Sequence, residues 1–273
     1  MNCEWQALLS ILPERIRKRV DEIGKETLQE IRLRMGQPPK LCLSMGFRDL
    51  GGNVKREELD YVVNTASRYS PWSMTSAKEG YLTAQGGHRI GLCGQAVMRD
   101  GRWEGLREVS SLCIRVARDF PGIAEGLPMD GSVLIIGKPG AGKTTLLRDL
   151  IRRRSAMEMV AVVDERGELL PKGVTADISC DVITHCPKAW GMDSVIRAMG
   201  PSTVAVDEIT AEADCDAMIR SAGCGVMLLA TAHARSKKDL ETRPIYRRLL
   251  EHNVFNHLVI LQPDKSWWTE RIR

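Results

Sequence analysis

The chain has 273 residues, which is enough for one large domain or two modest ones. Apolar residues make up 43% and charged residues 27%, as in an ordinary soluble globular protein, and no apolar run approaches the length that spans a membrane. The net charge of +4 is mild, so charge alone gives no argument for nucleic acid or an anionic membrane as a partner.

The N-terminal residues and the cysteines favour a cytoplasmic protein. Charged residues such as Glu4, Glu14 and Arg15 interrupt the first leucines, so we expect no signal peptide. None of the eight cysteines forms a C-x-x-C pair, which argues against a zinc site even though His185 lies beside Cys186. We therefore expect reduced, mostly buried thiols.

Residues 1–118 are expected to form a small α+β domain with an antiparallel sheet. Apolar residues at helical spacing predict helices, and Pro13 divides the first of these stretches into two short ones. Alternation of charged and apolar residues predicts half-buried strands, and Asp100 with Gly101 favours a hairpin turn. The expected helices occupy 4–20 and 55–69, and the expected strands occupy 30–35, 41–45 and short runs within 80–118.

Prolines and glycines between residues 119 and 131 predict a linker between two domains. After it, short apolar runs alternate with helical segments, which is typical of a parallel sheet covered by helices. Residues 132–273 are therefore expected to form an α/β domain. Its strands are expected at 132–137, 160–164, 203–207, 226–231 and 257–261.

The stretch from Gly137 to Thr144, G-K-P-G-A-G-K-T, matches a phosphate-binding loop, or P-loop. It follows an apolar strand and precedes a helix, which is the context that this loop requires. Backbone N–H groups and a helix N-terminus can hold a polyphosphate only where no side chain intervenes, which explains the glycines. Lys143 would reach the β- and γ-phosphates of ATP, and the Thr144 hydroxyl would bind Mg²⁺. The residues expected to bind the nucleotide are Gly137, Lys138, Pro139, Gly140, Ala141, Gly142, Lys143, Thr144 and Thr145.

Two further expected strands end in pairs of carboxylates. Asp207 would hold Mg²⁺ through water, and Glu208 would act on the attacking water. Asp164 and Glu165 could help to position Mg²⁺ or water, but Glu165 could instead pair with Arg166 as a structural tie. Spacing alone does not decide which glutamate is the principal catalytic residue.

A polar strand end and a group of arginines are further candidates for the site. Thr231 or His233 is expected to sense the γ-phosphate, because strands of α/β folds deliver active-site residues from their carboxyl ends. A neighbouring subunit could supply a cation for phosphoryl transfer, and Arg115 or Arg118 is the candidate, with Arg107 as a third. An ordinary surface or salt-bridge role is the alternative for each arginine.

Three consecutive arginines, Arg152 to Arg154, invite the hypothesis of nucleic-acid binding. They lie on a helix whose leucines are expected to face inward, so a solvated helix face is the favoured interpretation. Aromatic residues make up only 5% of the chain, which leaves few side chains for base stacking. Nucleic acid is therefore not an expected partner.

Motifs along nearly the whole chain resemble those of the stage III sporulation protein AA family and keep their order. In the N-terminal half they are EIRLRMGQP (30–38), GYLTAQGGHRIGLCG (80–94) and LREVSSLCIRVAR (106–118). In the C-terminal half they are GKPGAGKTTLLRDL (137–150), VDERGE (163–168), DVITHCPK (181–188), VDEI (206–209) and ATAHA (230–234).

The resemblance implies a fold and roles for these motifs. The fold would be a RecA-like P-loop NTPase domain with a parallel-rich sheet, preceded by a small α+β N-terminal domain. Asp164 and Glu165 would stand at the acidic-box position, Asp207 and Glu208 at the Walker B position, and His233 at the histidine-box position. The tetra-cysteine zinc module of many type II motors is absent. The acidic box is also shorter than in those motors, which leaves the division of labour between the two glutamates open.

The resulting hypothesis is a Mg²⁺-dependent ATPase whose hexameric ring drives or assembles a sporulation secretion channel between mother cell and forespore. The resemblance implies a cytoplasmic protein on the mother-cell side that reaches the membrane only through membrane proteins of the channel. Two alternatives stay open. The chain could be a nucleotide-dependent assembly scaffold with little hydrolysis, or a RecA-like motor that translocates nucleic acid.

Overall fold

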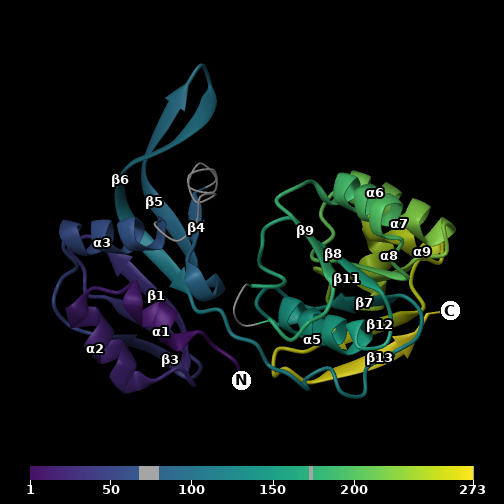
Figure 1. Ribbon diagram of the computed structural model, residues 1–273, viewed down its shortest axis with the longest axis horizontal. Helices are drawn as coiled ribbons and strands as arrows, with labels where there is room; N and C mark the ends of the chain where they lie inside the picture. Colours follow the sequence, from purple (N-terminus) through teal and green to yellow (C-terminus); the bar gives the residue numbers. More distant parts are fainter. Residues whose placement is uncertain (68–79, 172–174, 273) are drawn as a thin grey trace. The chain divides into compact units, whose positions relative to one another are not determined.

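The computed structural model describes residues 1–67, 80–171 and 175–272 and divides into two units (Figure 1). The first unit is Met1–Asp119 with Pro171–Val174, and the second is Phe120–Leu170 with Thr175–Arg273. Of the linker expected at 119–131, residue Asp119 belongs to the first unit and residues 120–131 belong to the second. Ala124 and Leu127 from this segment are buried in its core.

The first unit is built on an antiparallel sheet of six strands among the described residues, in the order β3-β2-β1-β6-β5-β4. Its strands are β1 (Leu28–Arg34), β2 (Lys40–Leu43), β3 (Gly46–Asp49), β4 (Tyr81–Thr83), β5 (Arg89–Arg99) and β6 (Arg102–Arg115). Its helices are α1 (Trp5–Ser10), α2 (Glu14–Ile23), α3 (Arg56–Ser67) and the 3₁₀ turn η1 (Gln85–Gly87). One apolar cluster joins the helices to the sheet, with Leu8, Val20, Ile31, Leu59 and Ile114 among its members.

Strands β5 and β6 form one long hairpin rather than the short runs expected from the sequence (Figure 1). Asp100 and Gly101 both have positive φ, as the two-residue turn of a hairpin requires. The sequence underestimates the length of these strands because their register shifts around Gly94. A Cβ atom at Gly94 would lie 2.5 Å from the carbonyl oxygen of Glu108, so only glycine fits there. Such a bulge breaks the alternation of side chains that marks a strand in a sequence.

The second unit contains a sheet of seven strands among the described residues, in the order β13-β12-β7-β11-β10-β8-β9. All pairs are parallel except β12 with β13. The strands are β7 (Val133–Ile136), β8 (Val160–Asp164), β9 (Asp181–Thr184), β10 (Thr203–Val206), β11 (Met227–Ala232), β12 (His257–Leu261) and β13 (Trp267–Arg271). The helices are α5 (Lys143–Ser155), α6 (Lys188–Met199), α7 (Glu212–Gly223), α8 (Lys237–Thr242) and α9 (Pro244–Glu251).

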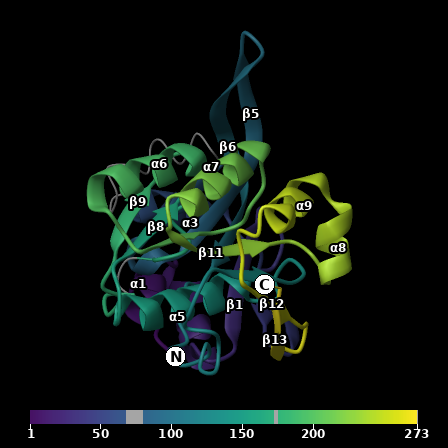
Figure 2. The ribbon, with the colours of Figure 1, turned by 90° about the vertical axis from the view of Figure 1, so that its right-hand side faces the viewer.

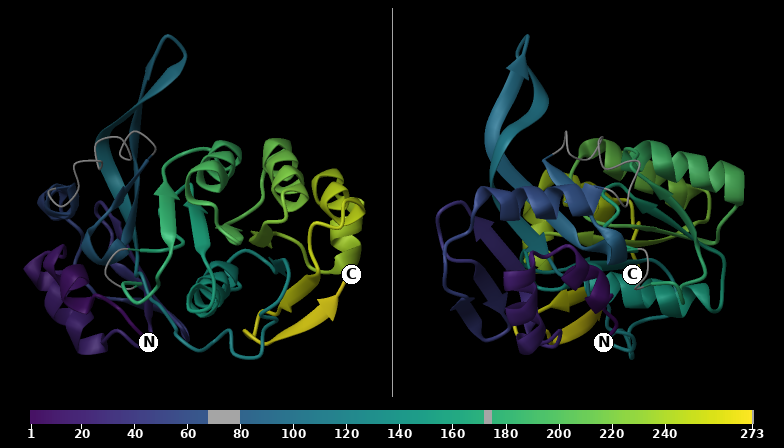
Figure 3. Two further views of the ribbon diagram at one scale, coloured as in Figure 1. Left: turned by 45° about the vertical axis from the view of Figure 1, so that its right-hand side comes forward. Right: turned by 60° about the vertical axis from the view of Figure 1, so that its left-hand side comes forward.

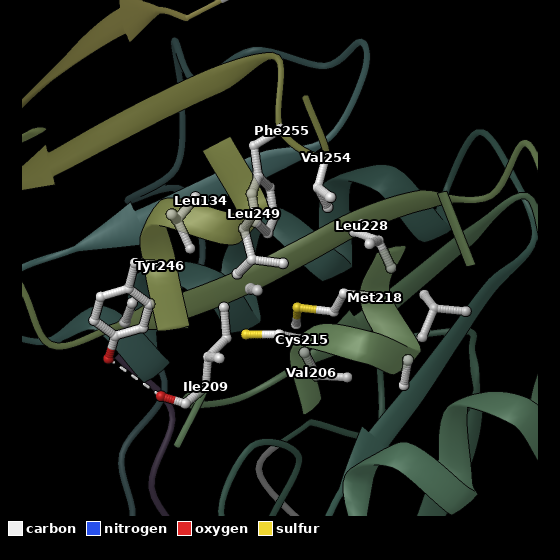
Figure 4. Close-up of a cluster of buried hydrophobic side chains, with 14 of the residues drawn as sticks. Leu134, Val206, Ile209, Cys215, Met218, Leu228, Tyr246, Leu249, Val254 and Phe255 are labelled. Atoms are coloured by element: carbon white, nitrogen blue, oxygen red, sulfur yellow. Dashed lines mark hydrogen bonds between the residues drawn. The ribbon is translucent and has the colours of Figure 1, made fainter. Parts of the chain in front are cut away.

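Helices cover both faces of this sheet (Figures 2 and 3). Val133 and Ile135 point into the cluster that α5 closes, whereas Leu134 and Ile136 point into the cluster on the side of α6, α7 and α9. The second cluster is drawn in Figure 4, where the Tyr246 hydroxyl donates a hydrogen bond to the carbonyl of Ile209 at 3.2 Å. Burial on both faces makes the central strands continuously apolar, which is why the sequence predicts them.

The sequence does not predict β3, β9 and β13. These strands lie at sheet edges and expose many of their residues, so they lack the apolar runs of the central strands. All eight cysteines are free thiols, as expected, but the expectation that most are buried is wrong: Cys215 is buried, Cys93 and Cys224 are exposed, and the other five are intermediate. No helix of the described residues is long and apolar enough to cross a bilayer.

Arg154 is buried, which corrects the expectation that the arginine triplet forms a solvated face. Its guanidinium is paired with Glu158 and donates hydrogen bonds to the carbonyl of Gly131 at 3.2 Å and to Thr203 Oγ1 at 3.1 Å. These bonds join α5 to β10 and to the turn before β7. The apolar side of α5 is therefore wider than the leucine spacing indicates, and an arginine occupies part of it.

We predict that Arg154→Met lowers the free energy of unfolding by about 3 kcal/mol, because it leaves the carboxylate of Glu158 without its cation. Urea unfolding of the purified protein measures this loss. Arg197→Met is the matched control, since exposed Arg197 bonds a carbonyl of its own helix. Its effect should stay within about 0.5 kcal/mol. Equal effects of the two variants would contradict a structural role for Arg154.

His88 joins the start of the first unit to the segment that follows β6. It is fully buried, and its Nδ1 accepts the backbone N–H of Ala117 at 3.1 Å, so its Nε2 donates to the carbonyl of Glu4 at 3.0 Å. Burial lowers the pKa of His88 below its usual range. Below about pH 6.5 the unfolded chain therefore binds a proton that the folded chain excludes.

We predict that stability falls as the pH drops below about 6.5, with His88 contributing at most about 1.4 kcal/mol per pH unit. Denaturant titrations between pH 7.5 and pH 5 measure the slope. In His88→Gln this part of the slope should disappear, whatever the stability of the variant at neutral pH. The same slope in both proteins would show that His88 does not carry the effect.

Candidate functional site

The P-loop connects β7 to α5, so its glycines lead directly into a helix of 13 residues. Gly140 and Gly142 have φ of 73° and 106°, in the left-handed region that favours glycine. Gly137 is needed for a different reason, since a Cβ atom there would lie 2.9 Å from the carbonyl oxygen of Leu261 on β12. Among the other expected nucleotide ligands, Lys138 and Pro139 are exposed. The loop thus presents backbone at the start of α5, as phosphate binding requires.

Asp207 follows β10, and its carboxylate accepts hydrogen bonds from two hydroxyl groups. Thr144 Oγ1, from the first turn of α5, donates to Asp207 Oδ2 at 3.1 Å. Thr231 Oγ1, from β11, donates to Asp207 Oδ1 at 2.9 Å. Because β11 lies between β10 and β7, the parallel order of the strands brings these three side chains to one edge of the sheet.

His233, one residue beyond β11, contacts both a cation and a carboxylate. Lys143 Nζ donates to His233 Nδ1 at 2.8 Å, and His233 Nε2 lies 2.8 Å from Glu208 Oε1. A lysine ammonium has only donors, so Nδ1 accepts, and Nε2 carries the proton that is donated to Glu208. Lys143 also donates to the carbonyl of Lys138 at 3.2 Å. The structure therefore connects the P-loop lysine to Glu208 through one imidazole.

Burial shifts the pKa of the Lys143 ammonium. The side chain is 6% exposed, and desolvation lowers its pKa, while the carboxylates of Glu208 and Asp207 act in the opposite direction. The two acids at the end of β10 thus stabilise the charge that the P-loop holds out of water.

The other acidic pair is engaged differently. Asp164, at the end of β8, accepts backbone N–H groups of Glu168, Leu169 and Leu170 at 3.0, 2.8 and 3.1 Å. Its carboxylate is buried, and burial raises its pKa. In this position it anchors the loop after β8, and a role as a Mg²⁺ ligand stays a prediction.

Glu165 pairs with Lys188, at the start of α6, and not with Arg166 as one interpretation of the sequence has it. Lys188 is buried and also lies 3.8 Å from a carboxylate oxygen of Asp214. Sequence reasoning missed Lys188. Lys188 is the last residue of the motif DVITHCPK, to which the sequence assigned no role. Strand β9, which the sequence does not predict, pairs with β8 and brings the start of α6 near Glu165.

Arg115 and Arg118 belong to the first unit. Arg115 lies 3.8 Å from Glu30, and its side chain is 64% exposed. Arg118 is half-buried, and desolvation lowers its pKa. Arg107 donates to Gln95 at 3.4 Å. A contact of these arginines with the nucleotide site stays a prediction.

The oxygen donors of this site fit Mg²⁺. Thr144 and Asp207 place a hydroxyl and a carboxylate 3.1 Å apart, and Mg²⁺ prefers oxygen ligands. Within the described part of the chain, no group of three or more His, Cys, Asp or Glu residues could hold a metal ion by itself.

Comparison with solved structures defines the class of the fold. The chain is similar to the Legionella pneumophila ATPase DotB, with a TM-score of 0.61 and 17% identity over 93% of this chain and 78% of that one. It is also similar to the pilus retraction motor PilT, with a TM-score of 0.62 and 15% identity over 90% and 76% of the two chains. The chain therefore shares the fold of these two proteins, and the expected fold class is confirmed.

Sequence comparison shows the family. The family model described as sporulation stage III, protein AA matches residues 3–270, and the chain belongs to this family. Stage III sporulation protein AA of Bacillus subtilis (strain 168) is 34% identical over 95% of this chain and 91% of the relative. Protein SEEDLING PLASTID DEVELOPMENT 1 of Arabidopsis thaliana is 27% identical over 90% of this chain and 36% of the relative. The family resemblance expected from the motifs is thus confirmed.

We predict that Asp164→Asn lowers the free energy of unfolding by about 2 kcal/mol without nucleotide or Mg²⁺, because the amide offers one acceptor oxygen to three N–H groups. Urea unfolding in EDTA measures the change. Asp130→Asn is the control, because the Asp130 side chain is 82% exposed. If Asp164→Asn matters only when Mg²⁺ and nucleotide are present, Asp164 belongs to the metal site instead.

Proposed function

We propose that this chain is a Mg²⁺-dependent ATPase that works as a ring motor and drives or assembles a sporulation secretion channel. The observation that carries the enzymatic part is the contact of His233 with both Lys143 and Glu208. It links the residue that would grip the phosphates to the residue that would act on water.

In this proposal the P-loop binds the triphosphate of ATP. Backbone N–H groups between Gly137 and Thr145 and the N-terminus of α5 hold the phosphates, and Lys143 exchanges its contacts with His233 and Lys138 for phosphate oxygens. That exchange is favourable, because a buried ammonium gains a much stronger charge partner than a neutral imidazole.

Thr144 and Asp207 hold the Mg²⁺, which when bound neutralises charge on the phosphate oxygens. Thr231 keeps the Asp207 carboxylate oriented by its hydrogen bond, 2.9 Å long. We assign Asp164 to the loop after β8 rather than to the metal, since its oxygens already accept three backbone N–H groups.

Glu208 is the principal catalytic residue in this proposal, and Glu165 is secondary. The carboxylate of Glu165 is paired with the buried ammonium of Lys188. This ion pair makes Glu165 less available to act on a water molecule. Glu208 follows the metal residue Asp207 directly and bonds only the neutral imidazole among the contacts described for it. Once Lys143 leaves His233 for phosphate, His233 can report this change to Glu208.

The biological role rests on the family and the fold. A relative 34% identical bears the name stage III sporulation protein AA, and proteins of the same fold are named as an ATPase and a pilus retraction motor. We propose a homo-hexamer in the mother-cell cytoplasm, held at the membrane by membrane proteins of the channel. In such a ring, Arg115 or Arg118 would approach the nucleotide of a neighbouring subunit.

We predict that Glu208→Gln lowers kcat for ATP hydrolysis at least about 100-fold and leaves nucleotide affinity within about threefold, because the amide keeps the shape but cannot act as a base. Steady-state kinetics and fluorescent-nucleotide titration measure the two quantities. Glu165→Gln is the matched control, and its loss of kcat should stay below about tenfold.

The reverse order of the two variants would assign the principal role to Glu165. If neither variant changes sporulation in cells while Lys143→Ala abolishes it, nucleotide binding alone suffices and the chain is an assembly scaffold.

A further inference from the structure

The turn between β12 and β13 lies against the P-loop. Strand β12 pairs with β7 in parallel, so its carboxyl end reaches the same edge of the sheet as the P-loop. The carbonyl of Leu261, the last residue of β12, lies 2.9 Å from the place where a Cβ atom of Gly137 would be. The turn that follows Leu261 therefore lies beside the loop, with Lys265 Nζ 3.9 Å from the place of a Cβ atom of Gly142.

Lys265 occupies a strained position in this turn. The N–H of Lys265 donates to the carbonyl of Gln262 at 3.1 Å, and the N–H of Gln262 donates to Ser266 at 2.8 Å. Lys265 has φ of 73°, the left-handed conformation that glycine normally supplies in such a hairpin loop. Asp264 fixes the turn further by accepting the Ser266 hydroxyl at 2.6 Å. A lysine here costs backbone strain, and strained residues gather at functional sites.

The Lys265 side chain ends on the backbone of the P-loop. Its ammonium donates to the carbonyls of Gly140 at 3.0 Å and of Ala141 at 2.9 Å. In a trans peptide the C=O and the following N–H point in opposite directions. The bond to the Ala141 carbonyl therefore turns the N–H of Gly142 away from Lys265. The N–H of Ala141, opposite the Gly140 carbonyl, donates to the carbonyl of Lys138 at 3.1 Å.

We propose that Lys265 is a positioning residue for phosphate binding, which deepens the proposed function and rests on it. By holding the carbonyls of Gly140 and Ala141, it fixes the backbone of the loop and keeps the N–H of Gly142 turned away from Lys265 before the nucleotide arrives. Its charge also withdraws electron density from these peptide groups and adds a positive potential beside the phosphates. The ligand class is the polyphosphate of a nucleotide, and the effect does not depend on the base.

The test uses three variants of the full chain and a fluorescent ADP as the probe. In Lys265→Gly we expect about tenfold weaker binding of the probe, because two charge-assisted hydrogen bonds to the loop are lost. Lys265→Arg keeps donors and charge and should stay within about threefold of the natural protein. Lys238→Gly, an exposed lysine of α8, is the control for loss of charge and should not change the affinity.

A second measurement separates positioning from a contribution to folding. Glycine relieves the left-handed strain at this position, which offsets the lost hydrogen bonds, so the Tm of Lys265→Gly without nucleotide should stay close to that of the natural protein. The loss should appear in KM for ATP rather than in kcat, because the loop holds substrate and transition state alike.

Equal affinity of Lys265→Gly and the natural protein would overturn this inference and leave the proposed ATPase intact. Weaker binding that follows a lower Tm in both the Gly and Arg variants would also overturn it. A natural protein that does not bind the probe at all would instead overturn the proposed function, and the role of Lys265 with it.

Discussion

The burial of one ammonium group is the constraint on which the site depends. Lys143 is 6% exposed, and removing its charge from water is costly unless other groups compensate. The compensating groups are the P-loop carbonyl of Lys138, the imidazole of His233 and the acidic pair after β10. These three groups come from parts of the chain that are far from one another in the sequence. A nucleotide phosphate is a better partner than any of these, so the same arrangement that tolerates Lys143 also prepares it to bind an anion.

The order of the strands explains how these groups meet. Strand β11 lies between β10 and β7, and all three are parallel, so their carboxyl ends share one edge of the sheet. Thr231 can therefore bond Asp207, and His233 can reach from Lys143 to Glu208. Strand β12 is also parallel to β7, so the turn that follows it lies at the same edge of the sheet and brings Lys265 to the P-loop. Each contact follows from strand direction and not from a long or flexible loop.

The central strands, the P-loop and the acids that follow β10 could be predicted from the sequence because their signals are local. An apolar run followed by glycines and a helix is visible within about 20 residues, and Asp207 follows directly after such a run. The contacts of Lys188, Arg154 and Lys265 could not be predicted, because they depend on the tertiary fold. Lys265 lies 125 positions from the glycine that it contacts. Arg154 is the buried member of an arginine triplet, and the helical spacing of the leucines does not indicate that it is buried.

The most direct test of the central claim is the specific ATPase activity of the purified protein over a wide range of protein concentration, with Lys143→Ala as the blank. We predict activity above the blank that rises per chain with concentration, because a neighbouring subunit completes the site in a ring. Activity that never exceeds the blank, including in the presence of the channel's membrane proteins, would contradict the proposal that this chain hydrolyses ATP.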